Sequence, residues 1–87
     1  MPNPLHRWQY ETFREMLVVA RKAAGLTQVE VAQRLAKPQS FVSKYEHGER
    51  RLDFTEFVEI ADILSIDVGR FNDEYRQQLL DAQARNG

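Results

Sequence analysis

Apolar residues recur along the chain at the three- and four-residue spacing of amphipathic helices, and no segment shows the strict alternation of a strand. The clearest case is the segment 13–24, where five residues form one apolar stripe: Phe13, Met16, Leu17, Ala20 and Ala24. Gly25 follows directly and suits the left-handed conformation that ends many helices. The pattern predicts a helix that ends at residue 24 and begins at about residue 5 or about residue 12.

Three further helix starts are marked by capping residues. Thr27 and Glu30 have the spacing of a capping box, in which each side chain accepts a hydrogen bond from the other residue's backbone N–H. Asp53 and Glu56 repeat this pattern, and Asp67 begins a weaker version of it. Each start is flanked by a pair of apolar residues that would pack across the first turn. The sequence therefore predicts helices that begin near residues 28, 53 and 68.

A fifth helix lies between these starts. Pro38 suits the first turn of a helix, where its missing N–H is not needed, and Gly48 suits the residue after the last turn. The predicted helices span about 5 or 12 to 24, 28–36, 38–47, 53–64 and 68–84, with loose ends at 1–4 and 85–87. The fold class is therefore all-α, and residues 1–87 are expected to form one compact five-helix domain.

Charge is distributed unevenly. The net charge is only −1, which by itself argues against a nucleic-acid binder. However, residues 34–51 contain five basic and two acidic residues, a balance of +3, while the rest of the chain contains seven basic and eleven acidic residues, a balance of −4. Positive charge is thus concentrated around the predicted helix 38–47.

That helix has two different faces. At about 100° per residue, one arc of roughly 140° carries only polar side chains, and the opposite side is apolar. The polar arc contains Gln39, Ser40, Ser43, Lys44 and His47, and the apolar side contains Phe41, Val42 and Tyr45. Amide, hydroxyl and ammonium groups are the types that reach base edges and phosphates in a major groove. The polar face is therefore a candidate DNA-reading surface.

The two predicted helices 28–36 and 38–47 are joined by a short turn, with the small Ala32 where they would cross, which is a helix-turn-helix layout. At this point the chain resembles the lambda-repressor-like phage repressor and Cro domains, also called the xenobiotic-response-element family. The resemblance runs from about 17 to 64. Its strongest parts are residues 20–28 (ARKAAGLTQ), 31–35 (VAQRL) and 39–51 (QSFVSKYEHGERR).

This resemblance implies roles for particular residues. Gln28 matches a family glutamine that contacts a DNA phosphate and braces the recognition helix, and Arg21 and Glu46 match an ion pair between the first and third helices. Val42 and Tyr45 match core positions. The family's base-reading positions fall on Gln39, Ser40, Ser43 and Lys44, and its phosphate contacts in the flanking loops fall on Lys37, Arg50 and Arg51.

The chain departs from the family pattern at two positions. Ala36 stands where the turn often has a glycine in the left-handed conformation, which would cost alanine roughly 1–2 kcal/mol. Pro38 stands where a serine or threonine usually caps the recognition helix, so a possible phosphate donor is lost. These departures leave the geometry of the turn open.

The last predicted helix has an apolar stripe only about 80° wide, formed by Val68, Phe71, Tyr75, Leu79 and Ala82. The stripe would pack on the other four helices or form a contact in a homodimer. The helix is longer than so small a core requires, so a dimer contact through Phe71, Tyr75 and Leu79 is expected.

The sequence therefore predicts a sequence-specific regulator of transcription that binds double-stranded DNA, with a homodimeric repressor as the leading hypothesis. The alternative is an antitoxin or another protein-interaction module on the same scaffold. We expect no enzymatic activity, since Ser40 and Ser43 have no adjacent base and no glycine loop for phosphate is present. The lack of cysteine, and of ligands near His47, predicts no metal or cofactor. No apolar run or signal peptide is apparent, which predicts a cytoplasmic protein without membrane contact.

Overall fold

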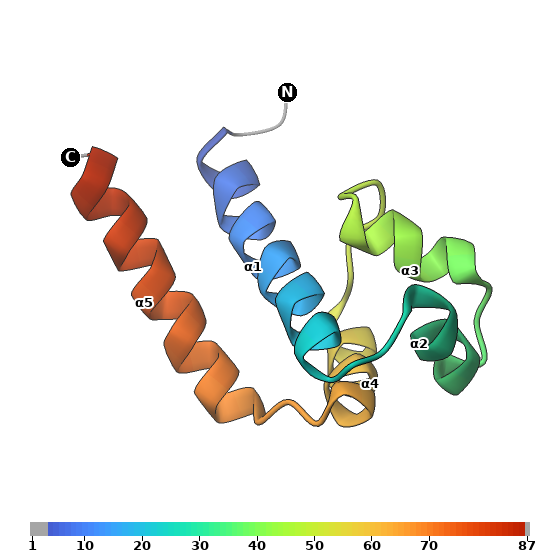
Figure 1. Cartoon of the computed structure of the whole chain (residues 1–87). Helices are drawn as coiled ribbons and strands as arrows, with labels where there is room; N and C mark the ends of the chain where they lie inside the picture. Colours follow the sequence, from blue (N-terminus) through green and yellow to red (C-terminus); the bar gives the residue numbers. More distant parts are fainter. Residues whose placement is uncertain (1–3, 87) are drawn as a thin grey trace.

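The computed structural model describes the backbone of residues 4–86 and the side chains of residues 8–85, and in this part of the chain it contains five α-helices and no strand. The helices are α1 (Pro4–Ala23), α2 (Gln28–Leu35), α3 (Gln39–Glu46), α4 (Phe54–Leu64) and α5 (Val68–Asn86) (Figure 1). The predicted all-α fold with five helices is confirmed. Of the two predicted starts for the first helix, the earlier one is correct, and the last helix continues to residue 86, so residues 4, 85 and 86 are helical rather than loose.

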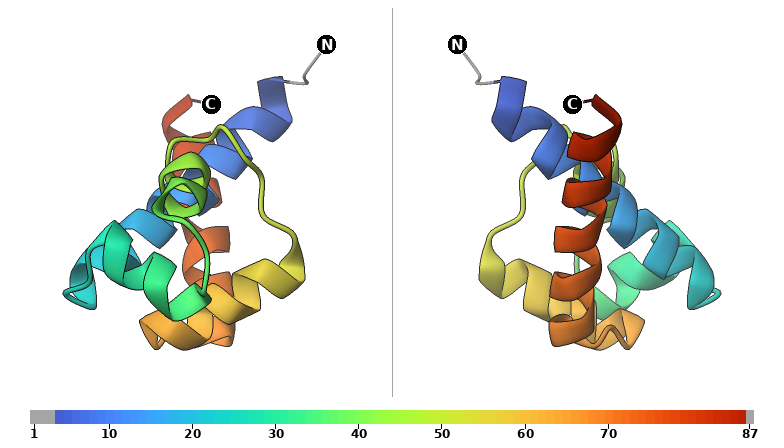
Figure 2. Two further views of the ribbon diagram at one scale, coloured as in Figure 1. Left: turned by 90° about the vertical axis from the view of Figure 1, so that its right-hand side faces the viewer. Right: turned by 90° about the vertical axis from the view of Figure 1, so that its left-hand side faces the viewer.

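The two long helices and the short ones occupy different parts of the molecule. Helices α1 and α5 run in opposite directions along one side, and α2 and α3 form a separate pair on the other. In the view of Figure 1, α4 lies in the lower centre, between the pair and the lower ends of α1 and α5 (Figures 1 and 2). Contacts join α1 to both α5 and α3, and α2 to both α3 and α4. The N-terminal helix thus connects the α5 side of the molecule with the α2–α3 pair. None of the described helices is long and apolar enough to cross a membrane.

The core lies where the helices meet. Its largest fully buried side chains are Leu17, Val31, Val42, Tyr45 and Ile60, with 1% or less of their surface exposed. They come from α1, α2, α3 and α4, so the α2–α3 pair shares one core with the two flanking helices. Burial of this apolar surface is the main force that holds the short helices α2 and α3, each of eight residues, in place.

Helix α5 is attached through an aromatic cluster. Phe71 is only 8% exposed, and its ring centroid lies 5.9 Å from that of Phe13 in α1 and 5.1 Å from that of Phe57 in α4. Tyr75, one turn later, also packs against the core. Phe71 is thus largely buried within its own chain, and the expected dimer contact through this helix stays a prediction.

The capping boxes predicted from the sequence are present. The N–H of Glu30 donates to the Thr27 hydroxyl at 3.1 Å, and the N–H of Thr27 donates to the Glu30 carboxylate at 2.9 Å. Asp53 and Glu56 make the same reciprocal pair at 2.8 and 3.0 Å. These bonds satisfy N–H groups that have no partner within the helix, and they fix where α2 and α4 begin.

Two non-glycine residues end helices in the left-handed conformation. Ala36 has φ +56° and ψ +42° after α2, and Ser65 has φ +57° and ψ +39° after α4. In each case the following N–H donates to a carbonyl five residues earlier, from Lys37 to Ala32 at 3.0 Å and from Ile66 to Ala61 at 2.8 Å. The turn between α2 and α3 therefore keeps the geometry that usually needs glycine, at a cost of roughly 1–2 kcal/mol.

Pro38 lies just before α3 rather than in its first turn. Its φ of −65° and ψ of 153° are extended, its carbonyl accepts from the N–H of Phe41 at 2.9 Å, and it makes no side-chain capping bond. The first helical residue is Gln39, so the predicted start is one residue early. The proline still directs the chain into α3, because its ring fixes φ and favours the extended conformation of Lys37.

Candidate nucleic-acid interface

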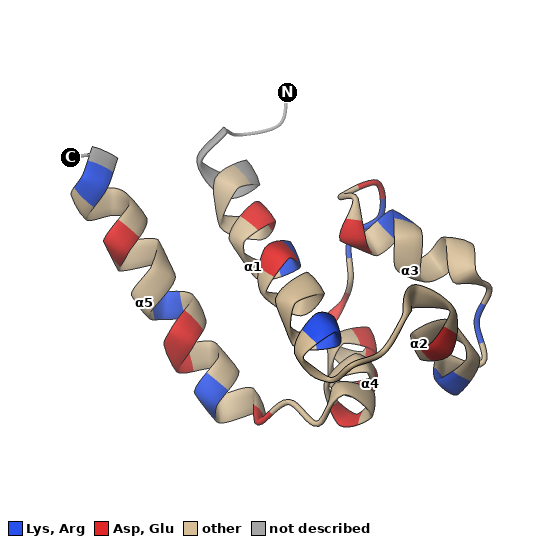
Figure 3. Ribbon diagram, viewed as in Figure 1, with Lys and Arg blue, Asp and Glu red and all other residues tan. Residues whose placement is uncertain are grey.

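The polar face of α3 points away from the core. Gln39, Ser40, Lys44 and His47 are exposed and Ser43 is half-buried, whereas Val42 and Tyr45 on the other side are almost fully enclosed. Figure 3 shows that most of α3 carries no charged residue, with charges at its C-terminal end and in the segments on either side. The structure thus brings Gln39, Ser40, Ser43 and Lys44 together on one outward surface, which we call the reading face.

One border of the reading face is a chain of hydrogen bonds that reaches from α1 to the start of α3. Arg21 donates from Nε and Nη2 to the two carboxylate oxygens of Glu46, at 2.7 and 3.1 Å. Gln28 donates from Nε2 to Glu46 Oε1 at 2.8 Å, and its own Oε1 accepts from Gln39 Nε2 at 3.2 Å. The amide of Gln39 is therefore connected to the ion pair through one side chain, that of Gln28.

This ion pair is enclosed by the helices it joins. Glu46 is the one buried charged residue among those described, at 5% exposed, and the Arg21 side chain is 12% exposed. The hydrogen bond from Arg21 to Glu46 raises the pKa of the guanidinium above its usual value, although burial opposes the shift. Arg21 also donates to the carbonyl of Leu26 at 2.9 Å. The pair therefore joins α1, the α1–α2 loop and α3.

Arg14 makes a second link between α1 and α3. Its Nη1 donates to the backbone carbonyl of Glu46 at 2.6 Å, near the C-terminal end of α3. A positive group at this end interacts favourably with the carbonyls that have no partner within the helix. Its side chain also lies beside Gly48, where a Cβ would be in van der Waals contact at 3.4 Å from Arg14 Nε. Gly48 has φ +82°, so this position favours glycine because of its backbone conformation.

Tyr45 has a buried hydroxyl with no hydrogen-bond partner among the described residues. Only 1% of the residue is exposed, and burial raises the pKa of the phenol well above its usual value. The ring packs edge-on against Phe41, with 5.7 Å between the centroids. Tyr45 is therefore held by packing, and its hydroxyl adds no hydrogen bond to offset its desolvation.

The other border of the reading face is built around Phe41. The Lys37 ammonium lies 5.6 Å from the centroid of this ring, and the Arg50 guanidinium lies 4.7 Å from it. Arg50 also donates from Nη1 and Nη2 to the two oxygens of Glu56, at 3.1 and 2.8 Å. This cluster of Lys37, Phe41, Arg50 and Glu56 attaches the segments before and after α3 to the start of α4.

The segment after α3 has a further anchor on α1. The Arg51 guanidinium lies 4.5 Å from the centroid of the Tyr10 ring, and the Tyr10 hydroxyl accepts from the N–H of Leu52 at 3.0 Å. At the end of α3 itself, His47 Nδ1 donates to the carbonyl of Ser43 at 2.7 Å. Arg51 and His47 are thus both exposed and held in defined positions.

Among the residues expected at the site, the structure brings Gln28 and Gln39 into contact and joins Arg21 to Glu46. It places Arg50 in an internal ion pair, which the sequence does not indicate. Two residues at the site have no signal in the sequence, because their partners are distant along the chain: Tyr10 and Arg14. Glu56 shows only its capping role in the sequence, although its carboxylate also binds Arg50.

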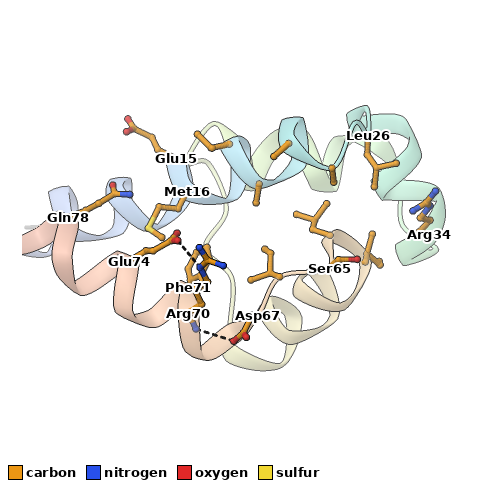
Figure 4. Close-up of a pocket in the computed structure, with 17 residues that line it drawn as sticks. Glu15, Met16, Leu26, Arg34, Ser65, Asp67, Arg70, Phe71, Glu74 and Gln78 are labelled. Atoms are coloured by element: carbon orange, nitrogen blue, oxygen red, sulfur yellow. Dashed lines mark hydrogen bonds and ion pairs between the residues drawn. The ribbon is translucent and has the colours of Figure 1, made fainter.

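Two hollows lie away from the reading face. The larger, about 800 Å³, is bordered by the C-terminal half of α1, the α4–α5 connection and α5 (Figure 4), and the exposed Val19 is among its lining residues. At its rim, Arg70 pairs with Glu74 and its N–H donates to Asp67. The smaller, about 390 Å³, is lined mainly by aromatic rings, including that of the exposed Phe54. Neither hollow is lined by a residue of α3.

Comparisons with known proteins agree with this geometry. The sequence model of a helix-turn-helix family matches residues 19–71, which include α2, the turn at Ala36 and α3. A solved structure of an XRE-family like protein from Pseudomonas syringae pv. tomato str. DC3000 is similar to the chain with a TM-score of 0.80 and 40% sequence identity, over 85% of this chain and 90% of that one. The chain belongs to the XRE family of helix-turn-helix proteins.

Membership of the XRE family identifies the chain as a helix-turn-helix regulator of the DNA-binding type. Helices α2 and α3 are the two helices of its motif, and the reading face lies on the second. No protein with a curated description shows significant similarity to the sequence. Which residues of this chain would contact DNA is therefore inferred from the geometry described above.

Proposed function

We propose that the chain is a sequence-specific regulator of transcription that binds double-stranded DNA with the reading face of α3 in the major groove. The observation that carries the proposal is that this polar face is exposed while its helix is fixed from both sides, by the Glu46 network and by the Phe41 cluster. A fixed helix loses little conformational entropy on binding, and its side chains approach base edges in a defined orientation.

Base recognition is assigned to Gln39, Ser40, Ser43 and Lys44. Lys44 is exposed and suits the acceptors at the guanine edge, and Gln39 suits adenine, where an amide donates and accepts at once. The bond from Gln39 to Gln28 uses one amide hydrogen of Gln39, which leaves its second hydrogen and its oxygen for a base. The network thus orients Gln39 without using up its hydrogen-bonding groups.

Phosphate contacts are assigned to Gln28, Lys37, Arg50 and Arg51. Gln28 uses one of its two amide hydrogens for Glu46, and the second is available to a phosphate oxygen. Lys37 and Arg51 are exposed and make no ion pair among the described residues. Arg50 differs, since a phosphate would have to compete with Glu56 for its guanidinium.

We further propose that the regulator acts as a homodimeric repressor. A domain of 87 residues has a small interface of its own with DNA, and a two-fold dimer would place two copies of α3 in successive major grooves about 34 Å apart. We assign the dimer contact to α5, where Phe71 is buried in its own chain, Tyr75 and Leu79 are half-buried and Leu80 is 59% exposed.

The decisive experiment is selection of binding sites from random duplex DNA, followed by titration of the selected site at several salt concentrations. We expect enrichment of a palindromic sequence and an affinity that falls steeply with salt, because each neutralised phosphate releases counterions. Sedimentation of the wild-type chain and of Leu80→Glu tests the dimer. Absence of any enriched sequence would contradict the proposal, and an affinity independent of salt would exclude the phosphate contacts.

A second candidate function is that of a protein-interaction module, for example an antitoxin, on the same scaffold. Two observations favour it: the acidic balance of the chain outside 34–51, and the hollow beside the exposed Val19. The site selection separates the two functions, since an interaction module that does not read DNA would enrich no sequence. An antitoxin would enrich a sequence and would also bind a protein partner.

A further inference from the structure

Two arginine–glutamate pairs among the described residues have two hydrogen bonds each, through different guanidinium nitrogens, and they differ in exposure. In the pair of Arg21 and Glu46, 12% and 5% of the side-chain surface is exposed. In the pair of Arg50 and Glu56, the values are 42% and 22%. The first pair is enclosed between helices, so its guanidinium is largely inaccessible to another anion. The second is open to solvent on the arginine side, so another anion can replace the carboxylate.

The open pair lies beside the reading face. Phe41 follows Lys44 around α3 by about 60°, given 100° per residue, so the Phe41 ring forms the edge of the face nearest Lys44. Two cations contact this ring, Lys37 at 5.6 Å and Arg50 at 4.7 Å. Among the described residues, Glu56 is the one anion that pairs with either of them. The edge of the face therefore carries two positive groups, one of them neutralised internally.

Arginine binds carboxylates and phosphates through the same planar pair of N–H donors. The two Glu56 oxygens occupy that pair of donors in Arg50, at 3.1 and 2.8 Å. A DNA backbone at the edge of the reading face would offer phosphate oxygens to the same donors. A phosphate that approaches this pair of donors would have to displace the Glu56 carboxylate from them.

We propose that Glu56 limits the affinity of the chain for DNA by competing with a backbone phosphate for the guanidinium of Arg50. This inference rests on the proposed DNA-binding function and deepens it, because it assigns a role in binding to a residue of α4, outside the helix-turn-helix motif. Glu56 remains ionised at neutral pH, since the hydrogen bond from Arg50 and the one from the Asp53 N–H lower the pKa of its carboxyl.

The test compares wild type, Glu56→Gln, Arg50→Ala and the double variant on one selected DNA duplex. Glutamine keeps an oxygen that accepts from the Asp53 N–H, so the capping box at the start of α4 is retained. We expect Glu56→Gln to bind about threefold to fivefold more tightly, which is the scale of an exposed ion pair. The slope of log affinity against log salt should steepen by up to about 0.9, the contribution of one phosphate contact.

The double variant separates competition from a general effect of charge. If Glu56 acts through Arg50, Glu56→Gln gives no gain in the Arg50→Ala background. A gain that persists in that background overturns the proposal, and so does the absence of a gain in the single variant. Glu30→Gln is the matched control, because Glu30 has the same position in the capping box of α2 and, among the described residues, no hydrogen bond from a cation. An equal gain from Glu30→Gln would also overturn the proposal.

A second variant covers the case in which Glu56→Gln does not fold. Glu56→Asp keeps the negative charge and moves the carboxylate back by one methylene from Arg50, so it should bind DNA more tightly than wild type by a smaller factor. Unchanged or weaker binding of this folded variant would contradict the proposal. Failure of the proposed function looks different: the wild-type chain would then select no duplex, whereas failure of this inference alone leaves wild-type binding intact.

Discussion

Arg21 and Glu46, which are 25 residues apart in the sequence, form a bidentate ion pair in which the carboxylate is almost completely enclosed. A buried pair of this kind contributes less to stability than its short distances suggest, because both charges lose their hydration. Removal of one partner is costly for the same reason, since the other charge is then buried alone. The pair therefore acts mainly as a fixed connection between α1 and α3.

Arg21→Ala should lower the free energy of unfolding by about 3–5 kcal/mol, because it leaves the Glu46 carboxylate buried without its cation. Urea denaturation followed by circular dichroism measures this change. The matched control is the double variant Arg21→Met with Glu46→Leu, which removes both charges and should be closer to wild type in stability. A double variant less stable than Arg21→Ala would show that the charges themselves stabilise the fold.

Tyr45→Phe should leave the free energy of unfolding unchanged or raise it, by about 1 kcal/mol. The Tyr45 hydroxyl is buried and has no partner among the described residues, so its removal relieves a desolvation penalty and breaks no hydrogen bond. Thermal denaturation of the two proteins at the same concentration gives the comparison. A clear loss of stability in Tyr45→Phe would mean that the hydroxyl has a bound water or another partner.

Ala36→Gly should stabilise the chain by about 0.5–1 kcal/mol. Glycine removes the strain of alanine at φ +56°, which is roughly 1–2 kcal/mol, and the greater freedom of glycine in the unfolded chain offsets part of this gain. Ser65→Gly is the matched control, since Ser65 has nearly the same backbone angles at the end of α4. If neither variant melts at a higher temperature than wild type, these positions are not strained in solution.

Stability should fall below about pH 4.5, with part of the loss due to Glu30, Asp53 and Glu56. Hydrogen bonds lower the pKa of all three carboxyls. The main donor is the Thr27 N–H for Glu30, the Glu56 N–H for Asp53 and the Arg50 guanidinium for Glu56. A carboxyl with a lower pKa in the folded state binds protons more readily when unfolded, so its stabilisation is complete above the unfolded pKa of 4.5 or 3.8 and is lost as the pH falls.

Urea midpoints measured between pH 7 and pH 3 test this dependence. The variant with Glu30→Gln and Asp53→Asn should show a shallower decline than wild type, because two of the three groups no longer titrate. An equally steep decline in that variant would assign the acid sensitivity to other carboxyls.

Lys44→Ala and Gln39→Ala should relax the preference for particular bases by about 1–3 kcal/mol for each lost pair. Arg51→Ala should instead weaken binding to all sequences alike, because Arg51 lies in the loop after α3 and is expected to contact the backbone. Competition titrations with the selected site and with single-base variants measure both effects. If Lys44→Ala kept the affinity and the selected site of wild type, the reading face would be assigned wrongly.

The fold could be predicted well from the sequence because local signals mark its elements. The capping boxes at Thr27 and Asp53 determine helix starts through bonds between residues three apart, so no tertiary information is needed. The role of Phe71 could not be predicted in this way. An apolar stripe looks the same in the sequence whether it packs on its own core or on a second chain, since both remove the same surface from water.

The candidate site was predictable only in part. The polar face of α3 follows from helical periodicity, but the residues that fix this face come from distant parts of the chain. Arg14 lies 32 residues before the carbonyl that it binds, and nothing near it in the sequence marks the contact. Glu56 has a capping role that already explains its place in the sequence. Its bond to Arg50 is therefore not predicted from the sequence.

The residues that hold α3 in the fold are not the same as the residues that form its reading face. Val42 and Tyr45 bury the helix and Glu46 joins it to its neighbours, whereas Ser40 and Lys44 make no hydrogen bond or ion pair through their side chains in the described part of the chain. Exchange of residues at 40 and 44 should thus leave the fold nearly as stable as before. The domain is consequently a suitable scaffold for libraries in which a few surface positions are randomised to obtain binders of new DNA sequences.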